Sequence, residues 1–446
     1  MKRIFIIGFF ALLGIQACKK DIALVDDKRP EERNLENVLK YKKELIGSTN
    51  GWTAYLYTND IGGAYNFYLS FSDKDRVSMV ADFIPESAAE SKESSYQVKQ
   101  VMVPTLIFDT YSYLHLLADP NPDEFGGNEG SGYGSDFEFE IREQKGDTLM
   151  LVGKKRNTKL VLIKATAEEK AFYTGGSFGT LVEDFDDYVS ANPFLYIADP
   201  QDNTKRIQVS INPNFDVRTA SFTSVDGGEI KSAQGLISYY PKGILLTQPL
   251  IYAGINFVAF EWDGTLGQIF GVTSAGTKIA IQTSATPILP LHLLMGTNYS
   301  AITVPRATNY PGWGTEFVTR RAAAATGVAR FSLSGSALSL DRMQFVFNSA
   351  LKTLNVVVIT PYANTSLTLP YPYTYTKTID GVYKFTLGTP TGNSAALIGA
   401  LDPILAQRLN VDNFTLDYFV NPTSGQILGQ FKSVNNPDFT FSGVLQ

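Results

Sequence analysis

Apolar residues near the start of the chain form one almost unbroken run. Residues 4–15, IFIIGFFALLGI, follow the charged pair Lys2 and Arg3 and precede Cys18. A helix of about 12 residues is only ~18 Å long, which is too short for a hydrocarbon core of ~30 Å. A charged start, a short apolar run and a small residue at the cleavage point are typical of a secretory signal.

Helical periodicity follows in residues 30–46. Pro30 suits the first helical turn, and the acidic residues after it complement the positive end of the helix dipole. The apolar residues of this stretch fall near one face. They are Leu35, Val38, Leu39, Leu45 and Ile46. We expect this helix to pack over one end of the β structure that follows.

From Trp52 onward the pattern changes to a period of two, which indicates strands with one buried face. Tyr65, Phe67, Leu69 and Phe71 alternate onto one face, and residues 136–141 alternate acidic and apolar positions. Short strands joined by short turns are typical of antiparallel barrels and sandwiches. The sequence therefore predicts a mainly β protein with an N-terminal packing helix and a C-terminal β domain that carries a short helix.

Interruptions of the strand pattern divide the chain. A short acidic helix is expected at 181–190, residues 299–330 lose regularity, and a second helix is expected at 394–408. The predicted organisation is a signal peptide (1–17), an anchor and tether (18–29), a helix with a barrel-like domain (30–195), a second β unit (196–300) and a C-terminal β domain (301–446).

Charge and cysteine content narrow the chemistry. The 446 residues carry a formal net charge of −6 without a basic block, which argues against nucleic acid as a partner. Cys18 is the only cysteine. If it is used for an anchor, the mature chain has no disulfide, no thiolate metal site and no cysteine nucleophile.

The first eighteen residues resemble a bacterial lipoprotein signal, which is cleaved before a cysteine that is then acylated. This resemblance implies attachment to a membrane through lipid on Cys18; an ordinary cleaved signal is the alternative. Lys20-Asp21 partly resembles the signal that sends Bacteroidetes lipoproteins to the cell surface, although Ile22 stands where a second acidic residue is usual. We expect an outer-membrane location, with the cell surface favoured over the periplasmic face.

Five short strings stand out beside the expected N-terminal helix: Asn50-Gly51-Trp52, Phe108-Asp109-Thr110-Tyr111, Leu114-His115, Asp136-Phe137-Glu138-Phe139 and Gly153-Lys154-Lys155. Together they resemble a family of unknown function among Bacteroidetes lipoproteins, often encoded near SusC/SusD-like uptake systems. The resemblance covers roughly residues 30–300. It implies a calycin-like barrel and SusC/SusD-like outer-membrane partners, and it supplies no catalytic residues.

Histidine is scarce, which limits metal and acid–base chemistry. His115 and His292 are the only two, and each lies in a Leu-His-Leu-Leu string. They could be axial haem ligands; the alternative is two partly buried histidines in apolar strands, each bonded to backbone. A duplication spaced by 177 residues or chance could explain the repeated string. We expect no metal site and no cofactor.

Catalysis is not expected either. No Gly-x-Ser-x-Gly elbow is present, and sequence spacing does not reveal the carboxylate pair of a glycoside hydrolase, which therefore stays an alternative.

Aromatic residues are the main surplus, with 23 Tyr, 29 Phe and 3 Trp. Tyr310 and Trp313 lie in a turn-forming stretch, and Tyr371 and Tyr373 alternate with prolines in a run that does not read as a central strand. Exposed rings flanked by polar atoms suit the C–H faces of sugars. We therefore predict a non-catalytic lipoprotein that binds a glycan or glycoprotein fragment, or serves as an accessory subunit of an uptake system; loops pinned to the barrel by these rings are the alternative.

Overall fold

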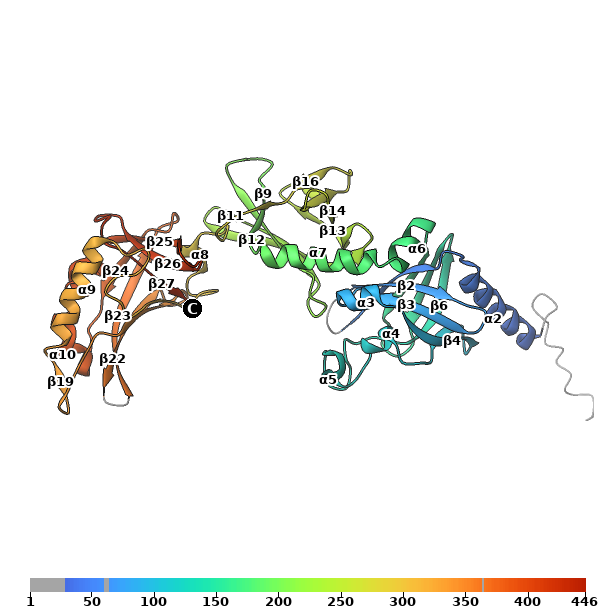
Figure 1. The fold of residues 1–446 in the computed structure, drawn as a ribbon, viewed down its shortest axis with the longest axis horizontal. Coiled ribbons are helices and arrows are strands. Elements are labelled where there is room, and N and C mark those ends of the chain that lie inside the picture. The colour runs from blue at the N-terminus through green and yellow to red at the C-terminus, as the bar shows by residue number, and fades with distance from the viewer. Residues whose placement is uncertain (1–28, 60–63, 363–364) are drawn as a thin grey trace, which may run out of the picture. The chain divides into compact units, whose positions relative to one another are not determined.

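The computed structural model describes residues 29–59, 64–362 and 365–446 (Figure 1). Cys18 and the signal peptide lie outside the described residues. The chain forms two closed antiparallel barrels and one open sheet, so the prediction of a mainly β architecture is confirmed. Two compact units are present, and segments 213–218 and 237–243 belong to the first, together with the chain up to Asp184.

The first barrel has eight strands in sequence order, and β8 closes it by pairing with β1. Alternate side chains point inward: Tyr65, Phe67 and Leu69 are fully buried, as their period of two predicts. The strands are β1 (Trp52–Tyr57), β2 (Ala64–Phe71), β3 (Arg76–Ala81), β4 (Lys92–Gln100), β5 (Pro104–Phe108), β6 (Glu138–Lys145), β7 (Thr148–Gly153) and β8 (Lys159–Lys164).

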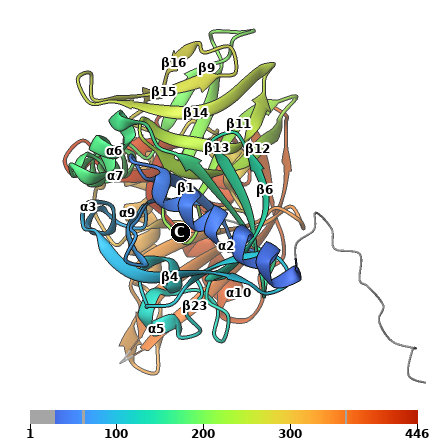
Figure 2. The same cartoon turned by 90° about the vertical axis from the view of Figure 1, so that its right-hand side faces the viewer.

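Helix α2 (Pro30–Gly47) covers one end of this barrel, in front of its strands in Figure 2. Leu45 is buried, and its carbonyl accepts a hydrogen bond of 2.9 Å from the indole of Trp52. The packing helix is therefore confirmed. The apolar face is narrower than expected, because Leu35 and Leu39 are exposed.

The connections of the barrel alternate between its two ends, as in any up-and-down barrel. Lys42 of α2 pairs with Asp75 in the β2–β3 turn, and Glu44 pairs with Lys164 at the end of β8. The β2–β3 turn and the end of β8 therefore lie at the α2 end of the barrel. The β4–β5 and β6–β7 turns lie at the same end. The β5–β6 connection and the β7–β8 turn lie at the opposite end. The short helices of this unit are α3 (Pro85–Ala89), α4 (Tyr113–Leu116), α5 (Pro122–Phe125) and α6 (Ala167–Thr174).

Helix α7 (Ser177–Ala191) is longer than the acidic helix expected at 181–190. An open sheet of nine strands follows, in the order β16-β15-β14-β13-β12-β11-β10-β9-β17. The strands are β9 (Leu195–Ala198), β10 (Arg206–Asn212), β11 (Thr219–Asp226), β12 (Glu229–Tyr240), β13 (Gly243–Tyr252), β14 (Ile255–Asp263), β15 (Gln268–Thr273), β16 (Lys278–Ala280) and β17 (Gln282–Thr283).

The second closed barrel forms the C-terminal part of the chain. Its strands are β18 (Ala301–Val304), β21 (Arg342–Asn348), β22 (Thr353–Tyr362), β23 (Thr365–Lys377), β24 (Tyr383–Leu387), β25 (Asn413–Val420), β26 (Ile427–Ser433) and β27 (Thr440–Leu445). A separate hairpin joins β19 (Ser332–Leu333) to β20 (Ser336–Ala337). The helices are α8 (Leu291–Leu294), α9 (Thr315–Val328), α10 (Gly392–Leu401) and a π-helix (Leu405–Leu409).

Two expectations for this region were wrong. The stretch 299–330 contains α9, whose Phe317, Arg321, Ala324 and Val328 are buried at helical spacing. Strand β23 is a central strand that pairs with both β22 and β24. Its prolines are tolerated because they precede Tyr373, where the pairing with β24 begins, so that the missing N–H groups interrupt no ladder on that side.

Candidate ligand-binding site

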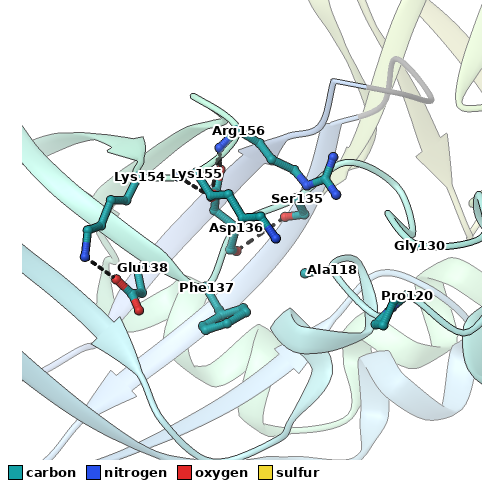
Figure 3. A pocket seen from close by; sticks show the side chains of 10 residues that line it. All are labelled: Ala118, Pro120, Gly130, Ser135, Asp136, Phe137, Glu138, Lys154, Lys155 and Arg156. Carbon is teal, nitrogen blue, oxygen red and sulfur yellow. Dashed lines mark hydrogen bonds and ion pairs between the residues drawn. The ribbon is translucent and has the colours of Figure 1, made fainter.

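A pocket of about 560 Å³ opens at the end of the first barrel that lies opposite to α2 (Figure 3). It lies between the β5–β6 connection and the β7–β8 turn. This volume falls within the range of roughly 300–1,000 Å³ that is usual for small-molecule sites. Its lining residues are Ala118, Pro120, Gly130, Ser135, Asp136, Phe137, Glu138, Lys154, Lys155 and Arg156.

Asp136 holds the two walls of the pocket together. Its carboxylate is buried and accepts hydrogen bonds from the N–H groups of Lys155 (2.9 Å) and Arg156 (3.1 Å) and from the hydroxyl of Thr158 (2.7 Å). Gly153 leaves the space for this carboxylate, because a Cβ there would lie 1.9 Å from Asp136 Oδ2. The β7–β8 turn is therefore fixed from within by one side chain of the opposite wall.

Phe137 supplies an exposed aromatic surface next to Asp136. Its ring is 42% exposed and stacks on the imidazole of His115, with ring centroids 5.2 Å apart. Tyr111, 55% exposed, stacks on the same imidazole at 5.6 Å. In Figure 3 the Phe137 ring lies between Glu138 and Ala118. We call Tyr111, His115 and Phe137 the aromatic ledge.

His115 is fixed within the ledge by both ring nitrogens. Nδ1 accepts a hydrogen bond from the N–H of Ser112 (3.2 Å), so Nε2 donates to the carbonyl of Phe108 (3.1 Å). Burial lowers the pKa of His115, whereas the Phe108 carbonyl and Asp109 oppose this change. The imidazole is therefore neutral at pH 7, and neither nitrogen is open to a metal.

Cationic side chains line the wall formed by the β7–β8 turn. Lys154 pairs with Glu138 at 2.9 Å, and this hydrogen bond raises the pKa of Lys154. Lys155 is exposed at the pocket. Both pocket carboxylates thus already have partners, because Asp136 is hydrogen-bonded to the turn and Glu138 is paired with Lys154. The ammonium groups and an aromatic face line the opening of the pocket. This arrangement can hold a ligand that offers hydroxyl or anionic oxygens together with an apolar face.

The predicted aromatic residues do not share one exposed surface. Tyr371 and Tyr373 are fully buried in the C-terminal barrel, and the hydroxyl of Tyr373 donates to the carbonyl of Leu405 (3.0 Å). Their predicted exposure was wrong, because inward positions of β23 alternate with its prolines. Tyr310 and Trp313 do line a depression of about 400 Å³.

Trp313 nevertheless packs as part of the C-terminal barrel. Its indole donates a hydrogen bond of 2.9 Å to the carbonyl of Ser442, and its ring meets Phe317 edge to face at 5.0 Å. Tyr310 lies against it, with ring centroids 5.8 Å apart. This depression keeps an aromatic wall, but most of the Trp313 ring is needed for packing.

The two histidine strings occupy different places in the fold. His115 lies in α4, after the fifth strand of its barrel, whereas His292 lies in α8, before the first strand of the other. Both strings are single helical turns, so the expectation of apolar strands was wrong. Burial lowers the pKa of His292 as well, and Lys377 adds to this effect. The positions do not correspond, which argues against a duplicated β unit.

Two further properties concern metals and membranes. Among the described residues, no group of three or more His, Cys, Asp and Glu side chains is placed to hold a metal ion. None of the helices in the described ranges is both long enough and apolar enough to cross a bilayer.

The fold and the pocket define a β-barrel protein with a small-molecule-sized site. Residues 25–264, more than half of the chain, match the family described as Domain of unknown function (DUF4302), and the chain belongs to this family. The resemblance to a family of unknown function is thereby confirmed.

Other comparisons add little. No curated protein matches the chain. A crystal structure of isotype 1 transferrin binding protein B (TbpB) from serogroup B Neisseria meningitidis is similar at 10% sequence identity and a TM-score of 0.12, over 88% of this chain and 73% of that one. Similarity at this level carries no information on fold or function.

Proposed function

We propose that this chain is a non-catalytic, lipid-anchored protein that captures an extracellular ligand, a glycan or glycoprotein fragment, in the pocket of the first barrel. The observation that carries this proposal is the exposed ring of Phe137, which is backed by His115 and bordered by Lys154 and Lys155. A flat aromatic face beside hydrogen-bond donors suits a sugar ring, whose C–H face stacks while its hydroxyls bond. The signal and Cys18 support an outer-membrane, surface location.

The state of the pocket carboxylates supports binding rather than hydrolysis. A glycoside hydrolase needs two carboxyl groups that face the scissile bond. Asp136 instead bonds two backbone N–H groups and Thr158, and Glu138 pairs with Lys154. Neither group is placed to give or take a proton at a ligand.

Haem binding is the less supported alternative. Both nitrogens of His115 already have partners in the protein, and stacking with Tyr111 and Phe137 holds the ring in that orientation. A haem ligand at this position would require α4 to rearrange. A partnership with SusC/SusD-like proteins remains a proposal that rests on the sequence resemblance.

Glycan-array binding of the mature chain tests the proposal, followed by titration calorimetry with the best ligand. We expect Phe137→Ala to weaken binding at least about tenfold, which corresponds to ~1.4 kcal/mol. Phe331→Ala removes a comparably exposed ring, 37% exposed in the second unit, and should leave affinity unchanged. Release of product from the ligand by the purified chain would contradict the non-catalytic assignment.

A further inference from the structure

The α2 end of the first barrel exposes four large apolar side chains. Leu35 and Leu39 on α2 are 59% and 54% exposed, and Val101 and Met102 in the β4–β5 turn are 55% and 88% exposed. We call these four residues the tether-end patch. Single exposed apolar residues are ordinary on a protein surface, whereas a group at one end requires an explanation.

The two halves of the tether-end patch belong to elements that pack together. Helix α2 packs along β4 and β5, the two strands that the Val101–Met102 turn joins. Leu35 and Leu39 are four residues apart and share one helix face. The turn is ordered by hydrogen bonds, from the N–H of Val101 to the carbonyl of Val103 (3.3 Å) and from the Gln100 side chain to the carbonyl of Met102 (3.2 Å).

We propose that the tether-end patch rests on the lipid bilayer in which the chain is anchored; this inference depends on the proposed acylation of Cys18. Pro30 follows Cys18 by 12 residues (30 − 18), and a chain of that length reaches roughly 40 Å at most. The patch therefore lies at the end of the barrel nearest to the anchor, within reach of the membrane.

Charged side chains of both signs lie near the patch. Lys40, Lys43 and Lys99 are exposed on the same elements, and so are Glu31, Glu32 and Glu36 on α2. Lysine stems lie along apolar surface while their ammonium groups meet phosphate headgroups. The apolar tips therefore carry the proposed contact, and the lysines can meet headgroups at the boundary with the acyl chains.

Contact at the tether-end patch sets the orientation of the site. The pocket lies at the opposite end of the same barrel, so resting the α2 end on the bilayer directs the pocket away from it. Strands of five to nine residues separate the two ends by roughly 15–30 Å. Anchor and patch together present the ligand site to the exterior.

The single cysteine allows a direct test. The acylated full chain carrying Met102→Cys has one free thiol, which is labelled with an environment-sensitive dye. The labelled chain is placed in vesicles of phosphatidylethanolamine with a minor share of phosphatidylglycerol. Ile84→Cys, at a position 43% exposed after β3 and so at the opposite end of the same barrel, is the matched control. We expect quenching by nitroxide lipid to be at least about twofold stronger at position 102 than at 84. Adding Leu35→Ser and Leu39→Ser should reduce the difference.

Each other outcome contradicts the contact. Equal quenching at both positions in a chain that floats with vesicles rejects the patch but keeps the anchor. A chain that does not float rejects both, and its Cys18 thiol then becomes labelled too. If the emission of the dye at position 102 shifts to the blue without lipid, and sedimentation gives twice the mass of one chain, the patch binds a second copy of the chain instead. Ligand binding, measured separately, is independent of all three results.

Discussion

The ring of Phe137 lies stacked on the imidazole of His115, with an interplanar angle of 26°. Phe137 comes from the residues just before β6, and His115 comes from α4. One ring is open to solvent and the other is buried, so the buried ring fixes the plane of the exposed one. An aromatic face that is held in place loses little side-chain entropy when a ligand stacks on it.

Stability should depend on pH through His115. Its pKa is lowered in the folded chain, so the unfolded chain takes up a proton first as pH falls below about 6.5. The free energy of unfolding that comes from the neutral His115 is present in full above about pH 6.5, and it is lost as the pH decreases. We expect wild type to lose more unfolding free energy than His115→Gln between pH 7.5 and 5.5, measured by urea unfolding. Equal losses would show that the imidazole is not held neutral.

The Asp136 carboxylate should control the pocket wall without touching the ligand. Asp136→Asn removes an acceptor of backbone N–H groups, and Gly153→Ala places a Cβ against the same carboxylate. We expect each change to cost about 2–3 kcal/mol of stability and to weaken ligand binding. Thermal unfolding and calorimetry measure the two effects. Gly47→Ala, at the end of α2 with nothing within 4 Å of an added Cβ and no positive φ, controls for glycine loss.

A buried ion pair should stabilise the first unit. Arg218 donates to both oxygens of Asp82, at 2.8 and 3.2 Å, and both side chains are fully buried. Burial lowers the pKa of Arg218, but Asp82, Tyr65 and Tyr239 together raise it, and burial raises the pKa of Asp82. The two hydrogen bonds from the guanidinium to the carboxylate are those of an ionised pair.

Removing one partner leaves a buried charge. We expect Arg218→Met to cost about 3–5 kcal/mol, and Arg218→Met with Asp82→Leu to recover much of this loss. Denaturant unfolding of the three chains gives the comparison. A single variant within ~1 kcal/mol of wild type would contradict the buried pairing.

Tyr371 and Tyr373 form a matched pair inside the second barrel. The Tyr373 hydroxyl donates to Leu405, whereas the buried Tyr371 hydroxyl has no hydrogen-bond partner among the described residues. We expect Tyr373→Phe to destabilise by about 1–2 kcal/mol and Tyr371→Phe to be neutral or stabilising. The denaturant midpoints of the two variants measure this difference. A Tyr371→Phe chain less stable than the Tyr373→Phe chain would contradict the hydrogen bond from Tyr373 to Leu405.

Local periodicity was enough to predict much of the fold. Leu45 on α2 and the inward residues Tyr65 and Phe67 lie where their spacing places them, because helix and strand periods depend on neighbours in sequence. The exposure predicted for Tyr371 was wrong because a run with several prolines usually marks an edge strand. Here β23 lacks a partner at Pro370 and Pro372 on only one of its two sides.

The pocket was missed for a different reason. Asp136 and Lys155 belong to strings that were interpreted as structural, and only the pairing of β6 with β7 and of β7 with β8 brings them together. A buried Asp136 followed by an exposed Phe137 reverses the expected alternation at the start of 136–141, whereas Phe139 and Ile141 are buried as expected. That reversal reflects the hydrogen bonds to the distant turn, which no spacing rule contains.

The central claim is that ligand binds at the aromatic ledge of the first barrel. The most direct test compares calorimetric affinities of Phe137→Ala and Trp313→Ala for the same array-selected glycan, with each variant shown to be folded. Binding at the ledge predicts at least about a tenfold loss for Phe137→Ala and a change under about twofold for Trp313→Ala. Unchanged affinity in Phe137→Ala, with loss in Trp313→Ala, would contradict the account.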